Sequence, residues 1–441
     1  MNNDTTQSLQ MTLGFDRSLV SWRRQSVRYL VADITVPDAP KAQVSSGTPM
    51  NLAIVIDASG SMTGVPLEYA KTAARGVIER LQDDDRLSLV SFADYVITHM
   101  EPTRLNREAR NRLLQAVAEL GTRGCTNLCA GWLEGAEWSA KEMLASNLPN
   151  GRVILLSDGH ANEGITDPIQ LADIAANLRH RGVYTSAVGI GDGYSPDQLL
   201  AISEYGGGRM HDAERPEEIV EVVLGELGES RRTAADDVRL EIQTPPHTKI
   251  ECLGGCPVSE SGSFFTIALG GLVSGSRRQV VLRVSTSEGS EGEVLNFTGR
   301  LRWRQPDSTT EVCGNYAMAQ LTRAASEALS QQPRDIERSQ LAAQLWLGDM
   351  VRESVRHNRQ GDYRAVQVYL EGQRKYFARY CQGLPEGPRM IRQFELLFGR
   401  TQRPMRERSL KEIALRHYKS SRSEVDHRSE RRPDWDEYLS E

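Results

Sequence analysis

The chain has 441 residues, too many for one ordinary hydrophobic core, so two or three domains are expected. Its composition, 39% hydrophobic and 25% charged, is typical of a soluble globular protein, and a net charge of −6 provides no electrostatic reason to expect a nucleic-acid partner. No apolar stretch approaches the roughly 20 residues that cross a bilayer, and the first residues lack the basic start and apolar core of a secretion signal. We therefore expect a cytoplasmic protein without nucleic-acid or membrane contacts.

The six cysteines are too few for a disulfide framework in a chain of this length. Two pairs have the spacing of metal ligands, so a zinc site is an alternative. One pair opens a predicted helix, the other lies in a Gly-Gly turn, and no histidine lies at a helpful interval. We expect reduced, partly buried thiols. The pairs are Cys125 with Cys129 and Cys252 with Cys256, whereas Cys313 and Cys381 stand alone.

Residues 1–49 contain one strand pattern followed by a linker. Arg24–Pro37 alternates between apolar and polar side chains like a half-buried strand. A stretch rich in Pro and Ser then leads to the next unit.

Short apolar strands alternate with amphipathic helices over residues 50–230. This order predicts a doubly wound, mostly parallel sheet with helices on both faces. Val96–Glu101 follows the preceding strand after only two residues, which predicts an antiparallel edge strand. The other expected strands are Leu52–Ile56, Arg86–Phe92, Arg152–Leu156 and Val183–Val188; the expected helices are Pro66–Leu81, Asn106–Leu120, Leu128–Leu144, Pro168–Arg181 and Pro216–Gly228.

Strands broken by Gly, Ser and Pro turns fill residues 236–314 and predict a small antiparallel β-sandwich. We predict that Arg24–Pro37 joins this sandwich, which makes the α/β unit an insertion between its strands. The expected strands are Val238–Gln243, Thr248–Leu253, Phe264–Leu269, Gln279–Val284 and Val294–Arg304.

Residues 315–399 are predicted to be entirely helical, and residues 400–441 form a charged tail with little apolar periodicity, which predicts a loose segment. The expected helices are Tyr316–Gln331, Asp335–Arg359, Asp362–Cys381 and Arg389–Phe398.

Oxygen-bearing side chains gather where the first strand of the α/β unit ends. Asp57, Ser59 and Ser61 follow this strand at alternate positions, and Gly60 between them allows the backbone to curl around an ion. Oxygen donors suit a hard cation such as Mg²⁺. Ligands of open α/β sheets gather beyond the carboxyl ends of the strands.

Two further loops should reach the same edge of the sheet. Thr126 precedes a predicted helix, and Asp158 follows the strand Arg152–Leu156. An alternative function for such Ser and Asp residues is to cap the helices that follow them. All three segments in this order favour a metal site over capping.

The segments AIVIDASGSM, GCTNL and ILLSDGHANEG together resemble the metal-ion-dependent adhesion site of von Willebrand factor A domains of the bacterial type. The resemblance covers about residues 50–230. It implies that Ser59, Ser61 and Thr126 are hydroxyl ligands of Mg²⁺, or of Mn²⁺ or Ca²⁺. It also implies that Asp57 and Asp158 act largely through bound water. Asp192 is interpreted as a turn residue and His160 as an exposed loop residue.

A binding module fits this pattern better than an enzyme does. The resemblance implies that the metal keeps one coordination position open for an Asp or Glu of a protein partner. We expect the protein to be part of a multiprotein complex. It also implies MoxR-type ATPases or kinase and phosphatase partners as candidates. The alternative is a metal-dependent hydrolase acting on phosphate or acyl groups, which needs a positioned base or a second metal. The sequence has no nucleophile elbow and no Walker-type loop for such chemistry. We therefore expect a scaffold without catalytic residues.

Overall fold

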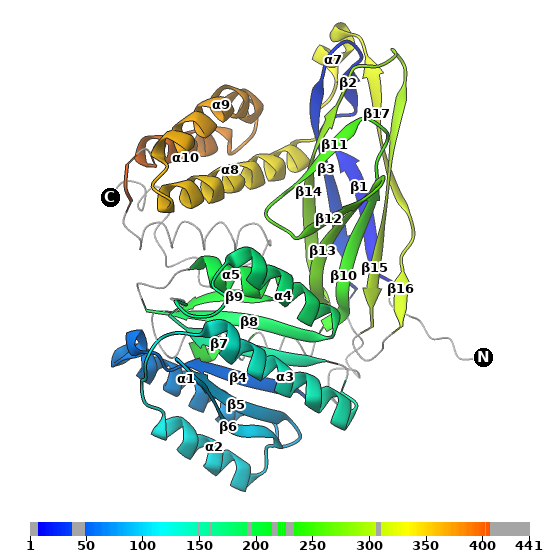
Figure 1. Cartoon of the computed structure of the whole chain (residues 1–441). Helices are drawn as coiled ribbons and strands as arrows, with labels where there is room; N and C mark the ends of the chain where they lie inside the picture. The colour runs from blue at the N-terminus through cyan, green and yellow to red at the C-terminus, as the bar shows by residue number, and fades with distance from the viewer. Residues whose placement is uncertain are drawn as a thin grey trace, which may run out of the picture.

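The computed structural model describes residues 8–405, apart from 38–48, 149, 159–160, 192–195, 214–218, 222, 224, 226–232, 306–309 and 402. Three parts are visible in Figure 1: an α/β unit, a body of long strands and a group of helices beside those strands. In the described part of the chain, no helix is both long enough and apolar enough to span a membrane.

The α/β unit contains a six-stranded sheet in the order β6-β5-β4-β7-β8-β9. Strand β6 is antiparallel to β5 and the other pairs are parallel, which confirms the predicted mostly parallel sheet and its edge strand. Sequence reasoning missed α5 and the glycine-rich β9. The strands are β4 (Asn51–Asp57), β5 (Arg86–Phe92), β6 (Val96–Arg104), β7 (Gly151–Ser157), β8 (Val183–Ile190) and β9 (Gly207–Ala213). The helices are η1 (Gly60–Met62), α1 (Val65–Arg80), α2 (Arg107–Glu119), α3 (Leu128–Ser146), α4 (Pro168–His180) and α5 (Pro196–Tyr205). Most of the predicted helix Pro216–Gly228 lies outside the described residues.

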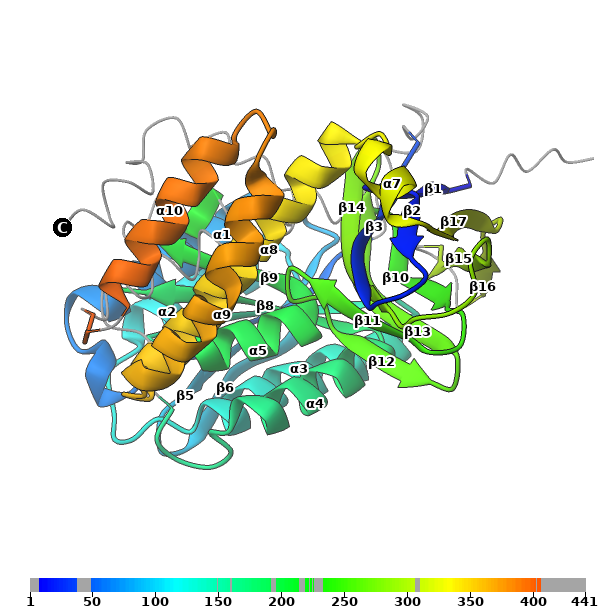
Figure 2. The same ribbon diagram turned by 90° about the horizontal axis from the view of Figure 1, so that it is seen from above.

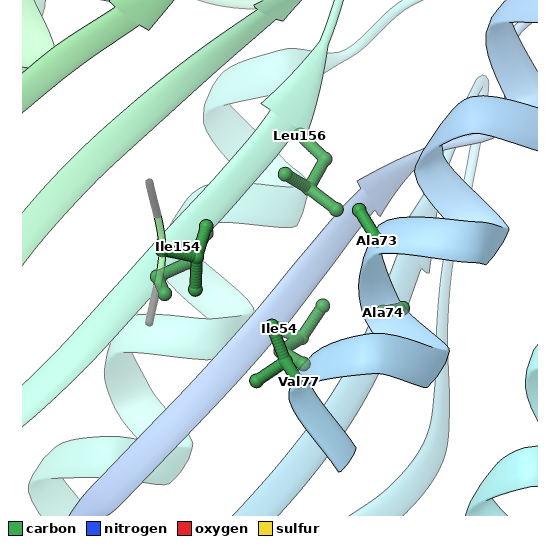
Figure 3. A pocket seen from close by; sticks show the side chains of 7 residues that line it. Ile54, Ala73, Ala74, Val77, Ile154 and Leu156 are labelled. Atoms are coloured by element: carbon green, nitrogen blue, oxygen red, sulfur yellow. The ribbon is translucent and has the colours of Figure 1, made fainter. Parts of the chain in front are cut away.

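Side chains of the buried strand β4 alternate between two hydrophobic cores. Ile54 packs with α1 and α2 on one face, whereas Val55 packs with α3, α4 and α5 on the other. The small side chains of Ala73 and Ala74 on α1 border a narrow apolar pocket that Ile54 also lines (Figure 3). Because both faces are covered, the polar groups of β4 and β7 are concentrated at the strand ends.

Two further sheets share one hydrophobic core. Their orders are β1-β3-β14-β11 and β12-β13-β10-β15-β17-β2, with β16 paired to β15. Strand β3, which precedes the α/β unit in the chain, pairs antiparallel with β14, which follows it, from Ser26 opposite Thr286 to Thr35 opposite Arg277. The strands are β1 (Gln10–Phe15), β2 (Leu19–Ser21), β3 (Ser26–Thr35), β10 (Thr233–Gln243), β11 (Thr248–Leu253), β12 (Val258–Ser261), β13 (Phe264–Val273), β14 (Arg277–Thr286), β15 (Val294–Arg304), β16 (Glu311–Cys313) and β17 (Ala317–Ala324).

The predicted helix Tyr316–Gln331 is wrong over most of its length. Ala317–Ala324 is β17, which pairs with β15 and β2, and only the short α7 (Ser326–Gln331) is helical. Ala319, Leu321 and Arg323 face inward along β17. The segment is rich in residues that favour helices, but pairing with two neighbouring strands and burial of alternate side chains override that preference.

Helices α8 (Ile336–Arg359), α9 (Tyr363–Cys381) and α10 (Gly387–Arg400) lie next to one another, as the view from above shows (Figure 2). The side chains of Asp335 and Asp362 cap α8 and α9. These helices match the three predicted ones closely. Helix α8 covers the outer face of the sheet that contains β3, β14 and β11, where Trp346 packs against Tyr29 with ring centroids 5.9 Å apart. Residues 406–441, most of the predicted tail, lie outside the described part.

Candidate metal centre

Asp57 is the last residue of β4 and is fully buried. Its Oδ1 accepts a hydrogen bond from the backbone N–H of Ser59 (2.9 Å) and its Oδ2 accepts one from the Ser157 hydroxyl (2.6 Å). Burial raises the pKa of Asp57 to about 6; the two hydrogen bonds lower it and the nearby charge of Asp158 raises it. The carboxylate is therefore fixed in orientation and electrostatically favours a nearby cation.

Ser157 was missed by sequence reasoning, although it was visible in the sequence as a hydroxyl residue immediately before Asp158. It ends β7, the neighbour of β4 in the sheet. Two adjacent strand ends therefore bring Ser157 and Asp57 into contact, and Asp158 follows directly, itself largely buried.

The two serine hydroxyls after β4 lie together. Ser59 Oγ and Ser61 Oγ are 3.0 Å apart. Ser59 is buried at the start of η1, whereas Ser61 within that helix is exposed. The hydroxyl pair thus extends from the buried carboxylate to the protein surface.

Backbone hydrogen bonds join the Thr126 loop to the β4 loop. Arg123 donates to the Ala58 carbonyl (2.6 Å), and Gly60 donates to the Gly124 carbonyl (3.1 Å). Thr126 lies two residues farther along and is buried. The structure therefore places the Thr126 loop against the segment that carries the two serines.

Asn162 holds Thr126 in position and was also missed. Its Oδ1 accepts from the Thr126 N–H (2.9 Å), and its own N–H donates to the Thr126 carbonyl (3.1 Å). Asn162 follows β7 by five residues, so it links the second and third loops. Its only signal in the sequence was its place in the motif after Asp158. His160 and Asp192 lie outside the described residues.

The donor set consists of carboxylate and hydroxyl oxygens, and this chemistry fits a hard divalent cation such as Mg²⁺. A buried carboxylate whose pKa is raised by burial and by a neighbouring carboxylate would be stabilised by such a cation. The cysteines were the alternative candidates for metal ligands. None of the six is in a disulfide, and no group of three or more His, Cys, Asp or Glu side chains is arranged to hold a metal within the described ranges.

Comparisons with known proteins agree with this arrangement of strands and loops. Residues 51–223 match the von Willebrand factor type A domain family. The chain is 26% identical to the uncharacterised protein sll0103 of Synechocystis sp., over 59% of this chain and 63% of that protein, and 23% identical to the uncharacterised protein YfbK of Escherichia coli, over 55% and 41%. The chain thus spans less than two thirds of the length of these curated relatives.

The fold of nearly the whole chain recurs in a solved structure. A von Willebrand factor type A protein from Catenulispora acidiphila superposes with a TM-score of 0.66, covering 97% of this chain and 99% of that one, at 16% identity. Identity at this level is evidence for the fold alone. The α/β unit at residues 51–223 is a von Willebrand factor type A domain.

Proposed function

We propose that this protein is a divalent-metal-dependent binding module that captures an acidic side chain of a protein partner. The observation that carries the proposal is that four oxygen-bearing side chains lie close together beyond the ends of β4 and β7. They are Asp57, Ser59, Ser61 and Asp158. The family match supports the same conclusion, because von Willebrand factor type A domains typically mediate protein–protein interaction.

The residues of the site would have two roles, as ligands of the metal and as groups that position those ligands. Ser59, Ser61 and Thr126 would supply hydroxyl ligands, while Asp57 and Asp158 would orient them and bound water. Ser157 and Asn162 hold Asp57 and Thr126 in place. A Mg²⁺ ion held by these residues would supply the positive charge that attracts a partner's carboxylate. The exposed Ser61 marks the side from which the partner's Asp or Glu would approach.

The partner class, a protein surface that presents an unpaired carboxylate, is inferred from the chemistry of the site. The resemblance of the sequence adds a MoxR-type ATPase, a kinase or a phosphatase as candidates. The protein would act as a scaffold, with the helices α8–α10 available for a second contact.

We also infer that the α/β unit is an insertion in the β-sandwich. The pairing of β3 with β14 supports this, because the two strands lie on opposite sides of residues 51–223 in the chain. The partner-binding edge of the unit would then be held by a separately folded frame.

Calorimetric titration with Mg²⁺ and Mn²⁺ tests the metal. We expect one ion per chain in the wild type, with binding lost in Asp57→Ala and weakened in Ser61→Ala. Asp84→Ala is the matched control, because Asp84 is an exposed carboxylate that pairs with Arg104 before β5, at the opposite edge of the sheet. Equal binding by the wild type and Asp57→Ala would refute the assignment.

A capture experiment tests the use of the metal. Proteins retained by the immobilised chain should be released by EDTA, rebind with Mg²⁺ and fail to bind to Thr126→Ala while the circular dichroism spectrum is unchanged. Turnover of a phosphate or peptide substrate with Mg²⁺, lost in Asp158→Ala, would instead establish the hydrolase alternative.

A further inference from the structure

Cys252 and Cys256, which are separated by three residues in the sequence, are neighbours in space. Cys252 lies on β11, Cys256 lies just beyond the end of that strand, and the two side chains are close enough to interact. Both are half-buried against the edge of the sandwich core. This contact between two thiols is independent of the candidate metal centre.

Two glycines with unusual backbone conformations lie between the two cysteines. Gly254 and Gly255 both have positive φ, 90° and 77°, a conformation that side-chain-bearing residues rarely adopt. A Cβ at Gly255 would also collide with the Arg352 guanidinium. Two consecutive residues with positive φ allow the backbone to bend sharply between Cys252 and Cys256.

Charged groups around the turn distinguish the two sulfur atoms. Arg278 Nη2 lies 3.8 Å from Cys256 Sγ, so a guanidinium group contacts this sulfur. Contact with Cys256 and burial hold the pKa of Cys252 well above its ordinary value. Cys256 is therefore suited to react first and Cys252 to react second.

We propose that Cys252 and Cys256 form a reversible dithiol–disulfide site that reacts with small-molecule disulfides. Cys256 loses its proton and attacks one sulfur of the small disulfide, which releases one thiol and leaves a mixed disulfide on Cys256. Cys252 then loses its proton and attacks Cys256 Sγ, releasing the second thiol. One small disulfide is reduced to two thiols, and the protein dithiol is oxidised to one disulfide.

The site adjoins the joint between the sandwich and α8. Asp349 on α8 accepts a hydrogen bond from the Gly254 N–H (3.2 Å) and pairs with Arg352 (3.0 Å). A disulfide across the turn would restrict the segment that carries Gly254. Oxidation should therefore reduce the opening motions of this joint.

The test is incubation of the folded full-length protein in glutathione buffers of increasing oxidised fraction, followed by alkylation and peptide mass spectrometry. We expect a disulfide between Cys252 and Cys256, with a mass lower by two hydrogen atoms, that excess reduced glutathione reverses. Cys252→Ser should accumulate a stable mixed disulfide with glutathione on Cys256. Cys313→Ser removes an exposed cysteine elsewhere and should form the disulfide between Cys252 and Cys256 as the wild type does.

Hydrogen exchange provides a readout that does not depend on the variants. Exchange over residues 250–258 should be slower in the oxidised protein, while exchange over β5 and β6 should be unchanged. The proposal is overturned if the pair stays reduced in buffers that modify the exposed Cys125 and Cys313. It is equally overturned if glutathione accumulates on both cysteines of the wild type and no disulfide forms between them.

Discussion

Asp349 should make the stability of this protein fall as the pH rises from about 4 to about 6. The carboxyl is buried on α8, and burial raises its pKa from the ordinary 3.8 to about 6, although Arg352 and the Gly254 N–H lower it. A raised pKa means that the folded state binds the proton more tightly than the unfolded state does. Stability is therefore greatest while Asp349 is protonated, and it declines as pH rises through the pKa of the folded state.

The expected magnitude follows from the shift in pKa. The difference between 3.8 and about 6 corresponds to about 3 kcal/mol of unfolding free energy, since each pH unit is about 1.4 kcal/mol. Asp349→Asn removes the titration and keeps an oxygen that can accept from the Gly254 N–H. The unfolding free energy of the variant, relative to the wild type, should rise by about 3 kcal/mol between pH 4 and pH 7.

Urea unfolding at five pH values from 4 to 8, followed by circular dichroism, measures this difference. The matched control is Glu353→Gln, on the same helix, where the carboxylate is paired with Arg356 and partly exposed. A rise of similar size in the comparison of Glu353→Gln with the wild type would show that the effect is not specific to Asp349. Identical pH dependence of the wild type and Asp349→Asn would refute the reasoning.

Three further predictions concern packing, the candidate metal centre and the architecture. Trp346→Ala should lower the unfolding free energy by about 3–5 kcal/mol in urea titrations, because the ring is buried against Tyr29 and Phe377; an effect below 1 kcal/mol would contradict this packing. Ser157→Ala removes a hydrogen bond that lowers the pKa of Asp57. The affinity for Mn²⁺, measured by calorimetry, should therefore fall about 10-fold or more, and it should fall further at pH 6 than at pH 8. Unchanged affinity would show that Ser157 does not influence the site. A fragment spanning 50–230 should unfold cooperatively, whereas 238–441 should aggregate on size-exclusion chromatography because it lacks β3 and exposes the edge of β14; a monomeric 238–441 fragment would argue against the inserted arrangement.

Local patterns were sufficient for much of the fold. The fully buried run at β4 and the amphipathic periods of α8 and α9 identify these elements because burial repeats at the spacing of a strand or a helix. The Asp and Ser residues after β4 also pointed to the candidate metal centre, because strand ends of a parallel sheet meet at one edge. Such features depend on short stretches of chain.

Other features depend on partners far away in the chain. Residues 317–324 favour a helix by composition, and only pairing with β15 and β2 makes them a strand. The bond from Ser157 to Asp57 joins residues 100 positions apart, and Asn162 reaches Thr126 across 36. Cys252 and Cys256 could be a pair by spacing, but the two positive-φ glycines between them and the contact of Gly254 with α8 determine how near the thiols lie. The physical reason is the same in each case: local propensities differ by about 1 kcal/mol or less per residue, and burial together with long-range hydrogen bonds outweighs them once the sheets assemble.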